Sequence, residues 1–236
     1  MQFDQTRLNA INAYGGEDLW RQAQHIEISL DATGLAFILK QRAVYEDVKM
    51  RLDVHRPYAE ITPLRKKDNI TGILDGGDVR LIDTKGNIVE ERKNARLAFN
   101  GMRRWLWWDD LDMCYFGNYA MWNYITLPAL LMREDITWIE TQPGSLKAIF
   151  PANIPTHCQI QEFHFDLTTG LLKQHNYTPD IISRFAKASN RVIEHKRSSD
   201  GIIYASERLV TPLSPTGKLL ESPKIIELSI RNFKLI

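Results

Sequence analysis

The amino-acid sequence predicts an α+β fold in which a single curved antiparallel β-sheet wraps around an inserted helical segment. Most of the chain consists of short segments with alternating polar and apolar residues, separated by turn residues. By contrast, residues 113–132 carry no charged side chain, although charged residues flank them on both sides. Because the chain has no long linker and no repeat of fixed period, we expect one domain over residues 1–236, with the helical insertion near 110–133.

The elements follow from local patterns. Residues 4–13 are predicted as a short helix that ends at Gly15 and Gly16. Turn sequences such as DGGD, TKGN, TTG and SSDG separate the strands that follow. About ten short strands are predicted, at ranges that include 23–32, 35–40, 47–55, 157–166, 171–177, 190–197, 202–210 and 224–231.

The uncharged segment has nearly the length of a membrane span but lacks its composition. Asn118 and Asn123 would place amides in hydrocarbon, and its aromatic residues are spread along the segment rather than gathered at its ends. We therefore expect no membrane span and interpret the segment as a buried helix, which Pro128 divides by starting a new helix after Thr126. Its aromatic stripe either packs in the core or lines a ligand site; its members are Tyr115, Tyr119 and Trp122.

Composition excludes some classes of function. Lys and Arg together number 30 and Asp and Glu 29, so the net charge is +1. The chain therefore lacks the overall positive charge that is typical of nucleic-acid-binding proteins. The first residues lack a basic start followed by an apolar run, which predicts a cytoplasmic protein. Cys114 and Cys158 have no CxxC spacing and are expected to be free thiols.

The hairpin over 157–177 is the first candidate for chemistry. With a turn at DLTTG, strict alternation would place Glu162, His164 and Asp166 on one face, together with His175 and Tyr177 of the partner strand. Imidazole beside carboxylate is the mixture that general acid–base catalysis needs. The alternative is a solvated outer face, which antiparallel sheets commonly have.

Two further segments are candidates for a functional site. In the hairpin over 190–210, His195 is predicted to lie opposite Tyr204, either as a partly buried pair or as a catalytic group. The segment RRWLWWDDLD (103–112) predicts either an aromatic binding rim or a loop whose aspartates cap the next helix. No phosphate loop, dinucleotide fingerprint, GxSxG or HExxH is present, so no metal site and no cofactor is predicted.

Several segments resemble bacterial proteins of uncharacterised function that have the LolA-like fold. The resemblance lies in AINAYGGEDLW (10–20), FNG (99–101), the aromatic helix, QEFHFDLTTGLLKQHNY (161–177) and DGIIYASERLV (200–210). It implies an open half-barrel, a strongly curved antiparallel sheet whose concave face is covered by helices. Classical members of this fold carry lipoproteins, and the violacein-pathway rearrangement enzyme with the same fold needs no cofactor. The resemblance therefore permits both a carrier and an enzyme.

The leading hypothesis is that the half-barrel binds a lipophilic or aromatic small molecule. The side chains expected to line its cavity are Trp105, Trp107, Trp108, Tyr115, Tyr119 and Trp122. The alternative is a cofactor-independent enzyme acting on such a molecule, with His164, His175, Tyr177 and His195 as candidate catalytic residues. A third hypothesis is a protein-interaction module whose barrel is filled and which binds a protein partner through an edge strand.

Overall fold

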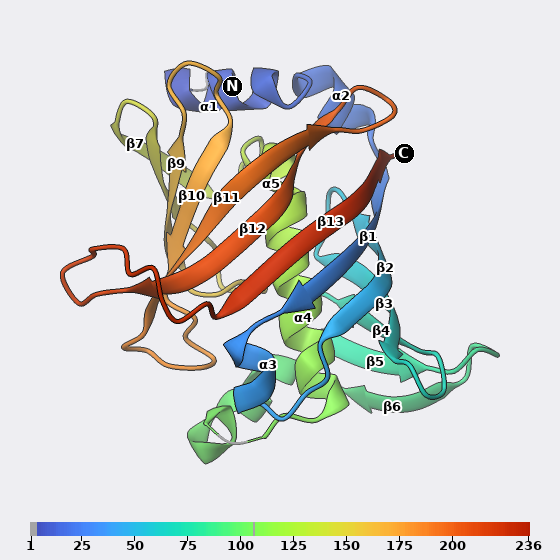
Figure 1. Ribbon diagram of the computed structural model, residues 1–236. Coiled ribbons are helices and arrows are strands. Elements are labelled where there is room, and N and C mark those ends of the chain that lie inside the picture. Colours follow the sequence, from blue (N-terminus) through green and yellow to red (C-terminus); the bar gives the residue numbers. More distant parts are fainter. Residues whose placement is uncertain (1–3, 106) are drawn as a thin grey trace.

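A computed structural model describes residues 4–105 and 107–236, and its strands form one antiparallel sheet that curves around a helix (Figure 1). The sheet has thirteen strands in the order β6-β5-β4-β3-β2-β1-β13-β12-β11-β10-β9-β8-β7. The predicted curved antiparallel sheet with covering helices is thus confirmed. The strand count exceeds the predicted ten.

The strand order shows how the chain builds this sheet. The chain starts in the middle with β1, adds strands outward to the edge strand β6, crosses to the opposite edge at β7, and returns strand by strand until β13 pairs with β1. The strands are β1 (His25–Thr33), β2 (Tyr45–Asp53), β3 (Tyr58–Arg65), β4 (Ile70–Asp75), β5 (Asp78–Ile82), β6 (Ile88–Arg92), β7 (Thr137–Gln142), β8 (Ser145–Ile149), β9 (Ile160–Phe165), β10 (Leu172–Tyr177), β11 (Lys187–Arg197), β12 (Ile203–Leu213) and β13 (Ile226–Leu235).

Helix α4 runs along the concave side of this sheet, with α1 and α2 at the top of the view and α3 at the bottom (Figure 1). The crossing between the two edges is made by the 3₁₀ turns η1 and η2, the long helix α4 and the short helix α5. The helical elements are α1 (Gln5–Ala13), α2 (Glu17–Gln22), α3 (Leu35–Leu39), η1 (Ala95–Phe99), η2 (Gly101–Arg104), α4 (Asp110–Ile125) and α5 (Leu127–Leu130). This connection joins β6 and β7 at opposite edges of the sheet and passes over its concave face.

Helix α4 is fixed at its start by a capping box. The Asp109 carboxylate accepts the Asp112 backbone N–H at 2.8 Å, and the Asp112 carboxylate accepts that of Asp109 at 3.1 Å. The body of the helix is buried, and the Trp122 indole N–H donates to the Asp53 carbonyl at 2.8 Å. The predicted division at Pro128 is confirmed, although the Thr126 hydroxyl bonds back to the Trp122 carbonyl instead of capping α5. No helix in the described ranges has the length and hydropathy that crossing a bilayer requires.

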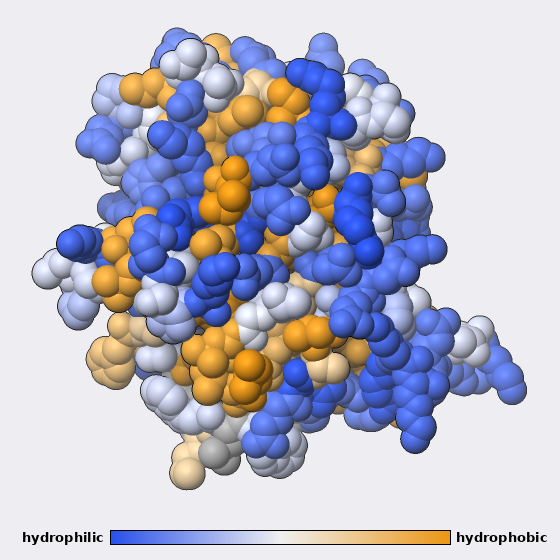
Figure 2. All heavy atoms as spheres, viewed as in Figure 1, coloured by the Kyte–Doolittle hydropathy of each residue, from blue (hydrophilic) through white to orange (hydrophobic). Residues whose placement is uncertain are grey.

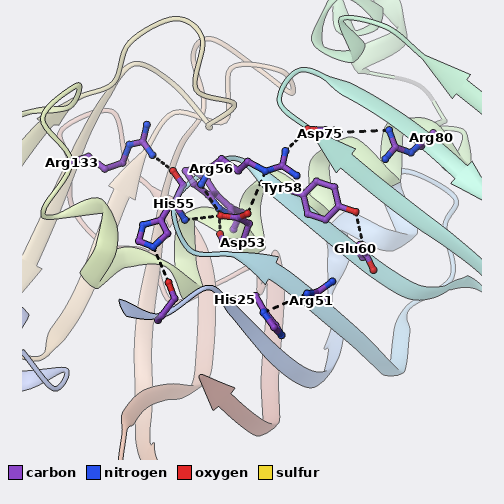
Figure 3. A network of polar contacts seen from close by, with 12 residues as sticks. His25, Arg51, Asp53, His55, Arg56, Tyr58, Glu60, Asp75, Arg80 and Arg133 are labelled. Carbon is purple, nitrogen blue, oxygen red and sulfur yellow. Dashed lines mark hydrogen bonds and ion pairs between the residues drawn. The ribbon is translucent and has the colours of Figure 1, made fainter. Parts of the chain in front are cut away.

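A charged network fastens the turn between β2 and β3 (Figure 3). The Asp53 carboxylate accepts the backbone N–H groups of His55 and Arg56 at 2.8 and 3.0 Å. The Arg56 guanidinium joins Asp53 to Asp75, at 3.3 and 2.6 Å, and Arg133 donates to the His55 carbonyl at 2.5 Å. This network therefore ties the turn to the segment that follows α5. Its groups pair with one another, which indicates a structural role.

One predicted element needs correction, and one strand was not predicted. Residues 35–40 form the helix α3 rather than a strand, since a short apolar run fits either and Gly34, with φ of 126°, turns the chain out of the sheet. Strand β3 has no counterpart in the prediction, which assigned no element between residues 55 and 69. The structure places Pro63 where the pairing of β3 with β4 is interrupted, between Ile61 and Arg65.

Candidate functional site

A cavity of about 60 Å³ lies between α4 and the concave face of the sheet. Strands β1, β2, β11, β12 and β13 form one wall, α4 forms another, and α3 closes one end. Helix α4 contributes Met113, Phe116, Gly117, Ala120, Met121 and Tyr124. These positions recur at steps of three and one, so they lie on one face of the helix. The cavity is thus built by the sheet's central strands and one stripe of α4.

The predicted aromatic stripe lies elsewhere on α4. Tyr115, Tyr119 and Trp122 are buried, but none of them borders this cavity. They face η1, residues 156–157 and the end of β2, where their hydroxyl and indole groups find partners. This predicted stripe packs in the core, whereas the neighbouring stripe, which includes Phe116 and Ala120, borders the cavity. Both stripes have helical spacing, so periodicity alone does not separate them.

The three tryptophans before α4 are placed differently from one another. Trp108 is buried and borders the cavity, with its ring edge-on to Phe99 and Phe116 at centroid distances of 5.2 Å each. Trp105 and Trp107 are 61% and 54% exposed and do not border it. Of the six aromatic residues predicted to line a ligand site, the structure therefore brings Trp108 to the cavity.

Polar atoms in the cavity wall lack hydrogen-bond partners among the described residues. These atoms belong to four buried residues that all border the cavity: Tyr45 Oη, Trp108 Nε1, Asn190 Nδ2 and Oδ1, and Arg208 Nε and Nη1. Buried polar groups without a partner are uncommon and call for an explanation. Sequence analysis missed Tyr45, Asn190 and Arg208, because each looks like an ordinary strand residue until the sheet is assembled.

The candidate residues of the 157–177 hairpin do not converge. His175 and Tyr177 are buried on the concave side, whereas His164 lies partly exposed on the other face of the sheet. The predicted common face is wrong because the register shifts between Leu172 and Gln174, where Lys173 is an extra residue opposite β9. A shift by one residue moves all following side chains to the other face. His175 consequently lies opposite Phe163 rather than Glu162.

The environments of these histidines keep them neutral. His175 Nε2 lies 2.6 Å from Gln161 Oε1, and its ring stacks on Phe163 at 4.1 Å. Burial lowers the pKa of His175 well below its ordinary value, and it also lowers the pKa of His164. His164 Nδ1 lies 2.9 Å from the Ser145 hydroxyl. A general base works best with a pKa near the operating pH, which burial does not provide here.

His195 also differs from its predicted position. It lies opposite Ala205, and Lys196 lies opposite Tyr204, because the turn sets a register one residue away from the predicted one, with Arg197 opposite Ile203. Its Nε2 is 3.1 Å from the Tyr14 hydroxyl, and burial lowers the pKa of His195 to about 4. This contact joins the start of the chain to β11. The role of His195 as a catalytic group stays a prediction.

Sequence analysis missed a buried cluster centred on His157. Its Nδ1 lies 3.2 Å from the Tyr119 hydroxyl and its Nε2 lies 2.8 Å from that of Tyr124, which in turn is 2.7 Å from the Tyr177 hydroxyl. The rings of His157 and Tyr177 stack at 3.8 Å. Burial lowers the pKa of His157 to about 3 and raises that of Tyr124 to about 12. The members satisfy one another, so the cluster holds α4 to the sheet.

The aspartates of 103–112 take part in the capping of α4 and in ion pairs. Asp109 and Asp112 pair with Arg92, each at 2.7 Å, and Asp110 pairs with Arg42. The interpretation as a helix cap is thus confirmed for Asp109. Within the part of the chain that the structure describes, no group of three or more His, Cys, Asp or Glu side chains is arranged to hold a metal ion.

Comparisons with known proteins bear on the fold. No family model matches the sequence, and no curated protein matches it. Among solved structures, a LolA superfamily protein from Nitrosomonas europaea matches with a TM-score of 0.51 and 8% identity, over 100% of this chain and 94% of that one. The chain has the LolA-like fold. A putative outer membrane lipoprotein-sorting protein domain from Vibrio parahaemolyticus matches this LolA-like chain with a TM-score of 0.50 and 9% identity, over 98% of this chain and 90% of that one.

Proposed function

We propose that this protein binds a lipophilic small molecule in the cavity between α4 and the sheet. The proposal rests on the composition of the cavity wall. It is apolar along α4, β1 and β13, yet it contains buried polar atoms that make no hydrogen bond within the described residues. Ligand sites typically combine an apolar lining with a few polar groups that orient the ligand. The LolA-like fold, with its curved sheet around a helix, supports the same function.

The closed cavity is smaller than such a ligand. A volume of about 60 Å³ holds on the order of four water molecules, whereas sites for drug-sized ligands measure roughly 300–1,000 Å³. Binding therefore requires that the wall move. Met113 and Met121 are flexible side chains that can change rotamer at small cost.

Helix α3 is the element best placed to open. Phe37 and Lys40 border the cavity, whereas Ile38 and Leu39 are 72% and 62% exposed. Figure 2 shows apolar surface over the lower part of the molecule, where Figure 1 places α3. Two backbone hydrogen bonds, from Leu35 and Ala36 to the segment before β13, hold the start of α3 at 3.2 and 3.0 Å. We propose that α3 moves outward to admit the ligand.

The test is titration with N-phenyl-1-naphthylamine, a neutral apolar fluorophore. Ala120 borders the cavity on α4, so Ala120→Phe fills the space and should weaken binding about tenfold or more. The matched control is Ala152→Phe in the wall of a separate open cleft, where it should leave binding unchanged. Both variants should unfold cooperatively in thermal denaturation. Equal binding by the Ala120→Phe variant and the wild type would place the ligand elsewhere, and absence of binding by the wild type would favour the protein-interaction alternative.

A further inference from the structure

We infer that the ligand is an amphiphile with a carboxylate head, which Arg208 and Asn190 bind at the inner end of the cavity. This inference rests on the proposed function and adds the chemical class of the ligand. It depends on the burial of Arg208, its unpaired donor atoms, its position in the sheet and the groups around it.

Arg208 is a buried cation without a counter-ion among the described residues. Its side chain projects from β12 to the concave side, and the residue is 5% exposed. Nη2 donates to the Tyr124 carbonyl at 3.1 Å, whereas Nε and Nη1 make no hydrogen bond. No carboxylate oxygen of the described residues lies within 4 Å of this guanidinium. By contrast, Arg42 and Arg92, which also lie near α4, pair with aspartates. Arginine keeps its proton even when buried, so the site carries a net positive charge.

Asn190 lies next to Arg208 in the register of the sheet. Asn190 on β11 pairs with Val210 on β12, which is two residues beyond Arg208 on the same face. Such diagonal neighbours are within reach of long side chains. Asn190 is fully buried, and its amide faces the Tyr124 hydroxyl without a hydrogen bond of ordinary length. The two residues therefore present a guanidinium and an amide to the same region.

This region is the inner end of the cavity. Arg208 and Tyr124 border both the main cavity and a smaller one of about 20 Å³ that continues toward Tyr14 and Phe233. The opposite end of the main cavity is closed by α3 and Trp108. A ligand that enters past α3 would thus lay its apolar part along α4 and bring its head to Arg208.

The groups that face Arg208 are neutral at physiological pH. The titratable neighbours are the hydroxyls of Tyr14, Tyr124 and Tyr177 and the imidazoles of His175 and His195. Burial raises the pKa of each of these tyrosines and lowers the pKa of both histidines. The one positive charge at this end of the cavity is balanced by one carboxylate, whereas a phosphate group would bring nearly two negative charges to it. The other cation in the wall, Lys40, lies over the Trp108 ring at the opposite end. The charge count therefore favours a carboxylate.

The test compares octanoate with 1-octanol, which has the same chain length and no charge, by calorimetric titration. The wild type should bind octanoate about tenfold or more tighter than 1-octanol, because a charge-assisted hydrogen bond replaces an unpaired buried cation. Arg208→Met should remove this preference while keeping 1-octanol binding. Arg231→Met, a change of the same kind at an arginine on β13 that pairs with Asp31 and Asp47, should keep it.

The outcomes separate this inference from the proposed function. Equal binding of both probes by the wild type overturns the carboxylate inference and leaves the proposed function standing, whereas binding of neither overturns both. The comparison of octanoate with 1-octanol uses the wild type alone, so it tests the carboxylate inference even if Arg208→Met fails to fold.

A further measurement is thermal unfolding without ligand: Arg208→Met should raise the midpoint, since an unpaired buried charge destabilises the protein. A strong fall in the midpoint would indicate that Arg208 is structural and would overturn the inference.

Discussion

His157 shows how far the surroundings of a single residue determine its chemistry. Its two ring nitrogens lie within hydrogen-bond distance of the Tyr119 and Tyr124 hydroxyls, and burial holds it neutral. Its seven-residue spacing from His164 matches no metal motif, so the sequence offered no signal for this cluster. Arg208 is a second example, because its proposed role depends on the folded chain bringing no carboxylate of the described residues to its guanidinium. Both residues acquire their properties from partners that lie far away in the sequence.

The His157 cluster predicts a pH dependence of stability. In the unfolded chain the imidazole takes up a proton near its ordinary pKa of 6.5, whereas folding lowers the pKa of His157 to about 3. The unfolded state therefore binds more protons between these values, and the stability present above pH 6.5 should fall as the pH decreases toward 3. The loss attributable to this residue is on the order of 4 kcal/mol. Urea denaturation of the wild type and of His157→Gln at several pH values should show a flatter profile for the variant, and parallel profiles would contradict the assignment.

Strand β10 shows how one element decides the position of several side chains. Lys173 is exposed, and it is the extra residue that turns His175 and Tyr177 to the concave side. Alternation was predicted correctly on both sides of the bulge, but the bulge itself has no sequence signature as clear as the turn that precedes it. The same limitation applies to β11, where two register shifts separate Val192 from His195.

Deletion of Lys173 should therefore be far more harmful than its substitution. Removing the extra residue would move either His175 and Tyr177 or Leu172 out of the core, and near-ultraviolet circular dichroism should show loss of the native fold. Lys173→Ala should change the free energy of unfolding by no more than about 0.5 kcal/mol, since the side chain is exposed. Native-like spectra for the deletion variant would show that the bulge is dispensable.

The whole molecule depends on the pairing of its first and last strands. β1 and β13 join the strands β2–β6 to the strands β7–β12, so the sheet is continuous only when β13 is in place. The two halves are also connected by α4, whose crossing places the cavity between them. The candidate site consequently exists only in the complete sheet, because its wall includes β1, β2, β11, β12 and β13.

Removal of residues 226–236 should accordingly abolish cooperative unfolding. The truncation exposes the adjoining edges of β1 and β12, both of which contribute buried apolar side chains. A synthetic peptide of residues 224–236 should restore cooperative unfolding in calorimetry when it is added during refolding. The matched control is deletion of the exposed turn 215–217, which should leave unfolding cooperative. Cooperative unfolding of the truncated chain would show that the fold does not depend on β13.

The sequence by itself determined the local elements: alternating strands, the turns between them, the uncharged helix and the division of that helix at Pro128. Each of these depends on neighbouring residues, so periodicity and turn chemistry are sufficient to predict it. Only the tertiary structure decided which stripe of α4 borders the cavity, on which face His164 and His175 lie, and that Arg208 has no counter-ion. The reason is physical, since strand register, bulges and the burial of charge depend on contacts between residues far apart in the chain.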